Sequence, residues 1–308
     1  MAPLKTLIVG AGAVGGYFGG RLAQAGRDVS FLIRPGRASV LETHGLVVRT
    51  PGGDFSVRPR VVLSGELDEP FELVVLATKA YGLEAALADV APAIGPHTTV
   101  LPLLNGMRHL DVLRDRFGTE RVVGGLCVIV SQLDPDGAVH QLADGASVSY
   151  GELDGSMSDR IRAVDDTFRG AVDGARLSGD ILQAMWEKWV VLAAGGALTC
   201  LLGGSIGQIV AVPGGEEIAR TIIHECSSVA EAEGFAPSAR SVEQTTARLT
   251  QQGSSFTTSM FRDAASGSPV EVEQILGDLV ARGDRHGVDV PTLRLATARL
   301  RIYQASLG

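Results

Sequence analysis

The first candidate site is the glycine-rich segment Gly10-Ala11-Gly12-Ala13-Val14-Gly15, which directly follows the apolar run Leu7-Ile8-Val9. Glycines at this spacing allow a tight turn and a close backbone approach, and a following helix N-terminus stabilises the charge of a pyrophosphate. The motif needs a strand before it and a helix after it. Both are expected, because 14–25 has a helical pattern and Gly26 can end that helix. The segment therefore predicts a dinucleotide site in preference to a glycine-rich turn without a ligand.

Two arginines follow the second expected strand, 28–33, where NAD and NADP are distinguished. An NAD-selective site usually places Asp or Glu here, on the ribose 2′-hydroxyl. This chain has Arg34 and Arg37 instead, and a guanidinium pairs with a phosphate through a planar fork of donors. We therefore predict NADP(H); the alternative is two solvated surface arginines.

Polar residues also follow two further apolar strands. Thr78 and Lys79 come after the run 73–77, and Asn105 comes after 99–104. Ligands of doubly wound sheets bind at the carboxyl ends of the strands. We expect Lys79 near the ribose or phosphates of the cofactor, and Asn105 on the nicotinamide ribose or the substrate. Solvated positions are the alternative for both side chains.

Lys188 is the candidate for proton transfer, because we expect it to open a strongly apolar helix that contains the stretch 189–202. A lysine on an apolar helix loses hydration, which weakens its hold on the proton and suits a proton donor. The competing interpretation is a lysine that reaches solvent from a helix end. Glu271 and Glu273 could be first-turn acids that the helix dipole favours. Composition and spacing alone assign neither acid to catalysis.

Length and composition predict that these residues belong to a chain of two domains. The chain has 308 residues, 45% of them hydrophobic, which is enough for two well-formed cores. A net charge of −8 and the lack of a basic run with interleaved aromatics argue against nucleic acid as a partner. The six histidines show no metal-ligand spacing, so no metal is expected.

The expected location is the cytoplasm. Cys127, Cys200 and Cys226 lie far apart in apolar surroundings and are interpreted as buried free thiols of a reducing compartment. The first strand begins almost at once, which leaves no room for a signal peptide. The stretch 189–202 is too short to span a bilayer, so no membrane contact is expected.

Strands and helices alternate through the first half of the chain, which predicts an N-terminal Rossmann-like α/β domain with a doubly wound sheet. A hairpin is expected from 45–50 and 54–61, followed by further strands at 121–132, 139–142 and 147–151. From Ile181 the apolar spacing is helical, with helices expected at 217–233, 242–251, 271–286 and 291–304. The predicted domains are 1–179, which binds NADP, and 180–308, a helical substrate and catalytic domain. The cleft between them is the expected active site.

Taken together, these segments resemble the ketopantoate reductase (2-dehydropantoate 2-reductase) family over nearly the whole chain. The resemblance implies a helical domain related to that of 6-phosphogluconate dehydrogenase. It also implies NADPH-dependent reduction of a 2-keto acid to a D-2-hydroxy acid, which is D-pantoate in pantothenate biosynthesis. A homodimer is one possible assembly. The matching pieces are Gly10–Gly16, Arg34, Thr78-Lys79, Asn105-Gly106, Trp186-x-Lys188, Ser259-Met260-x-x-Asp263 and Glu271.

The resemblance also assigns roles. Lys188 matches the catalytic lysine, which protonates the ketone oxygen as hydride arrives from nicotinamide C4. Glu271 matches an acid that contacts both the substrate and this lysine. Ser259, or Thr258 beside it, matches the serine that binds the substrate carboxylate. The remaining matches are contacts to cofactor and substrate, made by Lys79 and Asn105.

One departure concerns the substrate. Family members that form pantoate usually carry asparagines four and eight residues after the lysine, where this chain has Leu192 and Gly196, and a third that aligns near Ile206. A substrate hydroxyl left without partners is costly. The chain therefore either binds ketopantoate with a different polar set or reduces a more apolar 2-keto acid or another carbonyl compound. A dinucleotide-binding regulator without turnover is the third hypothesis, although it would need no proton donor.

Overall fold

The computed structural model describes residues 3–307. The chain divides into two compact units, one made of Met1–Leu104 and His109–Ile181, the other of Asn105–Arg108 and Leu182–Gly308. The short segment Asn105–Arg108 follows the α/β strands in the chain, yet it belongs to the helical unit. The functional assignment of 1–179 and 180–308 stays a prediction.

The first unit is built on a five-stranded parallel sheet with the order β5-β2-β1-β6-β7. Its strands are short, apolar and mostly buried on both faces, as parallel strands covered by helices must be. This sheet confirms the predicted Rossmann-like fold class. Its strands are β1 (Thr6–Val9), β2 (Val29–Leu32), β5 (Arg60–Val62), β6 (Leu73–Leu76) and β7 (Thr99–Pro102).

The helices of this unit follow the strands in alternation. They are α1 (Ala13–Gln24), α2 (Pro35–His44), η1 (Ala80–Gly82), α3 (Leu83–Val90), η2 (Ala91–Ala93), α4 (Arg108–Phe117), η3 (Thr119–Arg121) and α5 (Asp159–Phe168).

Two smaller sheets complete the unit. One has the order β4-β3-β10-β9, formed by Phe55–Val57, Leu46–Arg49, Val139–Gln141 and Ser131–Leu133. The other has the order β12-β11-β8, formed by Gly174–Leu177, Ser147–Gly151 and Gly124–Val128. The predicted hairpin is confirmed as β3–β4. Two expectations were wrong: 121–132 is two strands, β8 and β9, in different sheets, and 60–62 pairs in parallel with β2.

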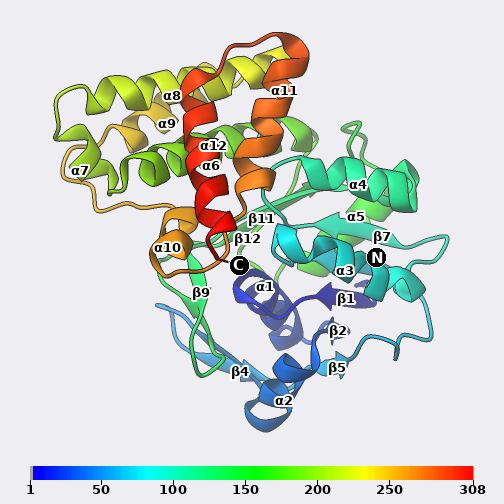
Figure 1. Cartoon of the computed structure of the whole chain (residues 1–308). Coiled ribbons are helices and arrows are strands. Elements are labelled where there is room, and N and C mark those ends of the chain that lie inside the picture. The colour runs from blue at the N-terminus through cyan, green and yellow to red at the C-terminus, as the bar shows by residue number, and fades with distance from the viewer. Residues whose placement is uncertain (1–2, 308) are drawn as a thin grey trace. The chain divides into compact units, whose positions relative to one another are not determined.

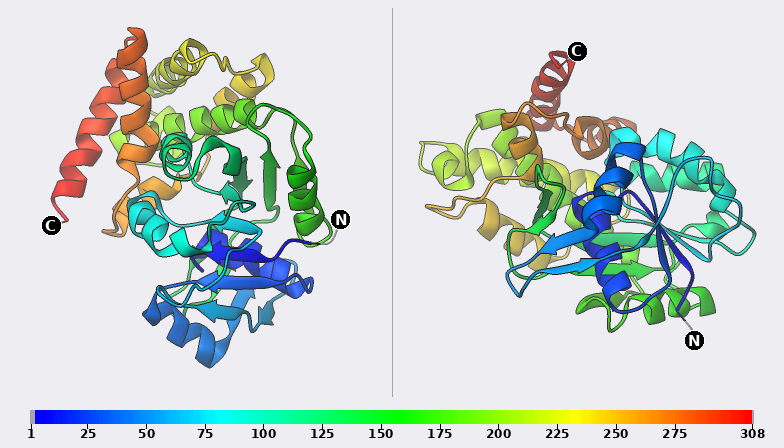
Figure 2. Two further views of the ribbon diagram at one scale, coloured as in Figure 1. Left: turned by 90° about the vertical axis from the view of Figure 1, so that its right-hand side faces the viewer. Right: turned by 90° about the horizontal axis from the view of Figure 1, so that it is seen from below.

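Helix α1 packs on both the parallel sheet and the sheet of β3, β4 and β10 (Figures 1 and 2). Close packing on both sides needs small residues along the helix. At Gly19, a Cβ would lie 2.5 Å from the Phe31 ring and 2.9 Å from Ile8, so a larger residue would push α1 off the strands. This packing fixes the start of α1, and therefore the glycine turn before it.

The second unit is all-helical, as predicted. It contains α6 (Ile181–Leu202), α7 (Ile206–Val210), α8 (Gly215–Ala232), α9 (Ala239–Leu249), α10 (Ser259–Ala265), the π-helical turn η4 (Glu273–Gly277), α11 (Asp278–His286) and α12 (Pro291–Ala305). The long helix α8 contacts α9, α11 and α12 (Figure 1). Sequence patterning located α8, α9 and α12, but it missed α10 and the π-helical turn at the start of 271–286.

Helix α6 is the core helix of this unit. Its length and composition would suffice to cross a membrane, but 67% of its apolar window is buried within the fold, as in a soluble protein. The helix begins at Ile181, so the expectation that Lys188 opens it was wrong. Trp186 and Trp189, each 1% exposed, pack against one another, and Phe235 stacks on Trp186. These aromatic contacts hold the part of α6 that carries Lys188.

Candidate active site

The glycine segment 10–15 forms the turn between β1 and α1. Gly12 is the N-cap of α1, so the first amides of the helix are not covered by a capping side chain. A Cβ on Gly12 would meet nothing within 4 Å, whereas a Cβ on Gly15 would overlap the Gly10 carbonyl oxygen. The turn is thus open where a ligand would approach and tight where the helix must start. Both properties fit a dinucleotide pyrophosphate.

The two arginines after β2 have different surroundings. Arg34 is exposed at the N-cap of α2, and its Nη2 lies 3.9 Å from the place of a Cβ on Gly82. Arg37 Nε donates to the Ala11 carbonyl at 2.9 Å, and its Nη1 donates to the Gly137 carbonyl at 2.6 Å. Burial lowers the pKa of Arg37. Arg37 therefore braces the glycine turn, and Arg34 is the arginine available to a phosphate.

Thr78 and Lys79 follow β6 beside the glycine turn. The Thr78 methyl lies 3.3 Å from the place of a Cβ on Gly10. The Thr78 hydroxyl is buried and has no hydrogen-bond partner among residues 3–307. Such a group costs free energy unless a ligand satisfies it, so this hydroxyl also fits a bound cofactor. Lys79 is exposed at the N-cap of η1.

Lys188 is half-buried, two turns into α6, and its Nζ donates a hydrogen bond to Asn105 Oδ1 at 3.0 Å. Its interior position in the helix argues against the interpretation as a lysine at a helix end. Both neighbours in sequence are fixed: Trp189 is buried, and Glu187 Oε1 accepts from the Ser238 amide at 2.8 Å. Of the residues 186–189, only Lys188 directs its polar group to another predicted site residue.

Thr258 and Ser259 begin α10, and only one of them has an exposed side chain. Thr258 Oγ1 accepts from the Phe261 amide at 3.3 Å and lies 2.9 Å from Thr199 Oγ1. Thr199 donates its own proton to the Gly195 carbonyl at 2.8 Å, so Thr258 is the donor between the two threonines. The Thr258 hydroxyl therefore forms hydrogen bonds within the fold, whereas the Ser259 side chain is exposed.

Helix α6 presents one face from Lys188 through Leu192, Gly195, Gly196 and Thr199, since residues at these spacings stack along a helix. A Cβ on Gly196 would lie 2.5 Å from Met260 Cε, and Met260 is 3% exposed. The Met260 side chain thus fills the space that a side chain at position 196 would take. Leu192, nearer to Lys188, is half-buried. This face is apolar where pantoate-forming relatives were expected to carry asparagines.

The structure groups the predicted residues by unit. In the α/β unit, the glycine turn, Arg34 and Thr78-Lys79 lie at the carboxyl ends of β1, β2 and β6. In the helical unit, Lys188 and Asn105 are bonded, and Glu271 is half-buried between two buried valines, Val270 and Val272. The roles of these side chains toward cofactor and substrate stay predictions.

Two residues of the helical unit escaped sequence reasoning. In the sequence Met260 stands out only as part of a motif, and no feature points to Gln274. Gln274 Nε2 donates to the Asn105 carbonyl at 3.1 Å. No pattern in the sequence links positions 169 residues apart, so only the fold could reveal this contact.

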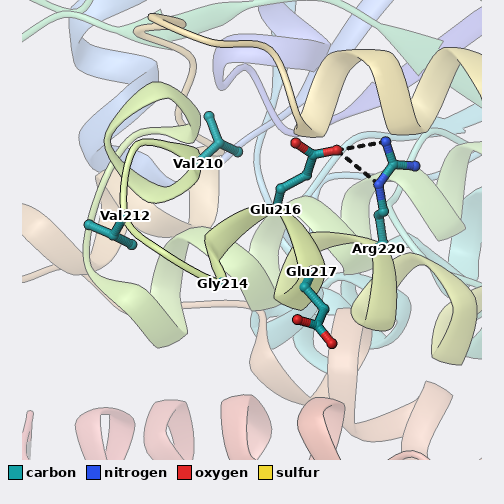
Figure 3. A pocket seen from close by; sticks show the side chains of 6 residues that line it. All are labelled: Val210, Val212, Gly214, Glu216, Glu217 and Arg220. Carbon is teal, nitrogen blue, oxygen red and sulfur yellow. Dashed lines mark hydrogen bonds and ion pairs between the residues drawn. The ribbon is translucent and has the colours of Figure 1, made fainter.

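A separate depression lies at the turn from α7 to α8 and holds none of the predicted site residues (Figure 3). It is lined by Val210, Val212, Gly214, Glu216, Glu217 and Arg220, with Glu216 bonded to Arg220.

The fold and these residues define a two-unit, dinucleotide-binding oxidoreductase. The family model "Ketopantoate reductase PanE/ApbA" matches residues 6–155, and its C-terminal model matches residues 180–304. The chain belongs to the ketopantoate reductase PanE/ApbA family, which confirms the resemblance seen in the sequence, and members of this family bind small keto-acid substrates.

Individual proteins of known sequence or structure are similar to this chain over nearly their full lengths. The oxidoreductase YkpB of Bacillus subtilis is 36% identical over 98% of this chain and 99% of its own. A 2-dehydropantoate 2-reductase of Mesorhizobium japonicum is 27% identical over 99% of both chains. The crystal structure of 2-dehydropantoate 2-reductase from Geobacter metallireducens is similar with a TM-score of 0.87 and 28% identity, over 96% of this chain and 99% of that one.

Proposed function

We propose that this chain catalyses NADPH-dependent reduction of a 2-keto acid to a D-2-hydroxy acid, with 2-dehydropantoate as the first candidate substrate and D-pantoate as its product. The observation that carries the proposal is the bond from Lys188 Nζ to Asn105 Oδ1 at 3.0 Å, in a family whose relatives include 2-dehydropantoate 2-reductases. Bound NADPH supplies a hydride to the carbonyl carbon.

Lys188 supplies the proton that completes the reduction. As the ketone oxygen gains negative charge, the ammonium donates an N–H to it and then transfers that proton, which leaves a neutral amine to be reprotonated from solvent. Asn105 accepts one N–H of the ammonium and so fixes the position of the amine. In this proposal Glu271 keeps the lysine charged and contacts the substrate, and Ser259 binds the substrate carboxylate. Thr258 is the weaker candidate, because its hydroxyl already has two partners.

NADP(H) is the proposed cofactor. Arg34 is exposed just after β2, and no carboxylate follows that strand within 33–37 to hold a ribose 2′-hydroxyl or repel a phosphate. The glycine turn would hold the pyrophosphate, and Thr78 and Lys79 would contact the cofactor from the end of β6.

A more apolar 2-keto acid is the second candidate substrate, and one observation favours it. Met260 fills the space over Gly196, and Leu192 lies between that contact and Lys188 on the same face of α6. A pocket bounded by these two side chains would offer no hydrogen bond to the ketopantoate hydroxyl. It would instead bury a branched or aryl side chain.

Oxidation of NADPH with a panel of 2-keto acids tests the proposal. Turnover with ketopantoate supports the first candidate, and turnover only with 4-methyl-2-oxopentanoate, phenylpyruvate or similar acids supports the second. No turnover with any member of the panel contradicts the proposal and favours a dinucleotide-binding regulator.

The cytoplasmic location is proposed on the cysteines. All three are buried free thiols, and burial raises the pKa of Cys200 to about 11 and that of Cys226 further. Such thiols remain protonated and serve as core residues.

A homodimer stays a prediction.

A further inference from the structure

The loop that carries Asn105 lies on the π-helical turn η4. Gln274, which is 7% exposed, donates from Nε2 to the Asn105 carbonyl at 3.1 Å. A Cβ on the next residue, Gly106, would lie only 2.5 Å from the Gln274 carbonyl oxygen, and Gly106 has a φ of +77°. Only glycine therefore fits at this point. Gln274 thus contacts the loop through both its side chain and its backbone.

The turn that carries Gln274 is itself held from α6. Trp189 Nε1 donates to the Ile275 carbonyl at 2.9 Å, and Trp189 follows Lys188 directly in sequence. π-Helical turns are rare, and they occur frequently at functional sites. The turn is therefore tied to the neighbour of Lys188 on one side and to the loop of its acceptor, Asn105, on the other.

We infer that Gln274 is a positioning residue, which fixes the backbone of Asn105 and thereby the place where Asn105 Oδ1 holds the Lys188 ammonium; this rests on the proposed function. Gln274 is a buried amide whose donor is used on this loop, beside a glycine that by itself gives the loop freedom. A misplacement of a reacting group by about 1 Å can cost roughly 10²-fold in rate. A single hydrogen bond at this point therefore matters more for turnover than for stability.

The test replaces Gln274 with methionine, which keeps the side-chain length and removes the donor. For Gln274→Met, kcat should fall about 10- to 100-fold, while the KM for NADPH rises much less, because the glycine turn, Arg34, Thr78 and Lys79 are predicted to hold the cofactor without Asn105. If Gln274→Met is not recovered folded, Gln274→Leu carries the same test, since it also lacks the donor and introduces no charge.

A double-mutant cycle shows whether Gln274 acts through Asn105. In an Asn105→Ala background, Gln274→Met should cost little further kcat, because the acceptor it positions is already gone. Full additivity, or an unchanged kcat in the single variant, overturns the inference. Gln208→Met is the matched control: Gln208 Oε1 accepts from the Ser205 amide at 2.9 Å to cap α7, so this variant should lose stability and keep kcat.

Lys188→Ala separates this inference from the proposed function. Loss of turnover in Lys188→Ala with normal turnover in Gln274→Met overturns the inference alone. Normal turnover in Lys188→Ala, or no turnover of the wild type with the whole panel, overturns both.

Discussion

Lys188 and Asn105 stand 83 residues apart in the sequence, and Lys188 Nζ donates to Asn105 Oδ1 at 3.0 Å. The two residues come from different kinds of segment, since one lies inside the buried helix α6 and the other lies on a short loop with a glycine beside it. Helix α6 fixes the backbone of Lys188, and the hydrogen bond to the Asn105 amide fixes the ammonium at the end of its flexible side chain. A side chain held at both ends is suited to present a proton in one direction.

Removal of the amine should abolish most turnover and spare cofactor binding. For Lys188→Ala we expect kcat to fall about 10²- to 10⁴-fold, the usual contribution of a positioned acid. NADPH affinity, measured by titration of its fluorescence, should stay within about threefold, because the predicted cofactor contacts other than Asn105 lie in the α/β unit. Near-normal turnover would remove the role of Lys188 as proton donor.

Arg34 should set the preference for NADPH over NADH. Charge-assisted hydrogen bonds contribute about 1.5–3 kcal/mol, so Arg34→Ala should raise the KM for NADPH roughly 10- to 100-fold and leave the KM for NADH nearly unchanged. Comparison of both KM values in wild type and variant checks this. A clear preference of the wild type for NADH would contradict the NADP(H) proposal.

Arg37→Ala is the matched comparison for Arg34→Ala. Because Arg37 bonds the Ala11 and Gly137 carbonyls, its loss should lower the free energy of unfolding by about 1–3 kcal/mol. NADPH and NADH should then both bind less well, since the glycine turn loses the hydrogen bond that Arg37 donates to the Ala11 carbonyl.

Sequence patterning found the residues whose roles depend on local context. The glycine turn needs only a strand before it and a helix after it, and Lys188 stands out as a charge at the start of an apolar run. The role of Arg37 could not be foreseen, because its two acceptors lie 26 and 100 residues away. Two other features could not be predicted for the same reason. They are the split of 121–132 between two sheets and the contact of Gln274 with Asn105. Each depends on a long-range pairing that leaves no periodic signal.

Met260 and Gly196 should control the size and polarity of the substrate pocket. Gly196→Asn alone introduces a side chain where Met260 Cε already lies, so it should destabilise the fold by about 1–3 kcal/mol. Gly196→Asn with Met260→Ala provides the space and a polar group together. The double variant should be less destabilised than the sum of the two single variants.

The same double variant tests the substrate. If the apolar face excludes ketopantoate, the double variant should raise kcat/KM for ketopantoate relative to 4-methyl-2-oxopentanoate. A ratio that falls or stays constant would mean that this face of α6 does not contact the substrate side chain.

The ion pairs around Glu233, which lie beside Trp186 and Trp189, should make the free energy of unfolding depend on pH. Arg282, 8% exposed, lies over the rings of Trp186 and Trp189, and its Nη1 donates to Glu233 Oε2 at 2.7 Å. Burial alone would raise the pKa of Glu233, but the hydrogen bond and charge of Arg282 outweigh it, so the pKa is lowered. Arg285 and His286 face the same carboxylate.

A carboxylate whose pKa is lowered on folding stabilises the protein above its unfolded pKa, and this contribution is lost as the pH falls through the folded value. We therefore expect the free energy of unfolding to decrease from about pH 5 downward, with part of the slope due to Glu233. Glu233→Gln should lower stability at pH 7 by about 1–3 kcal/mol, since it leaves Arg282 with a weaker partner. Denaturant unfolding of both proteins from pH 7 to pH 3 measures the difference. The two curves should converge at low pH, where the wild-type carboxyl is also neutral; a constant gap would mean that Glu233 stabilises the cluster by packing and not by its charge.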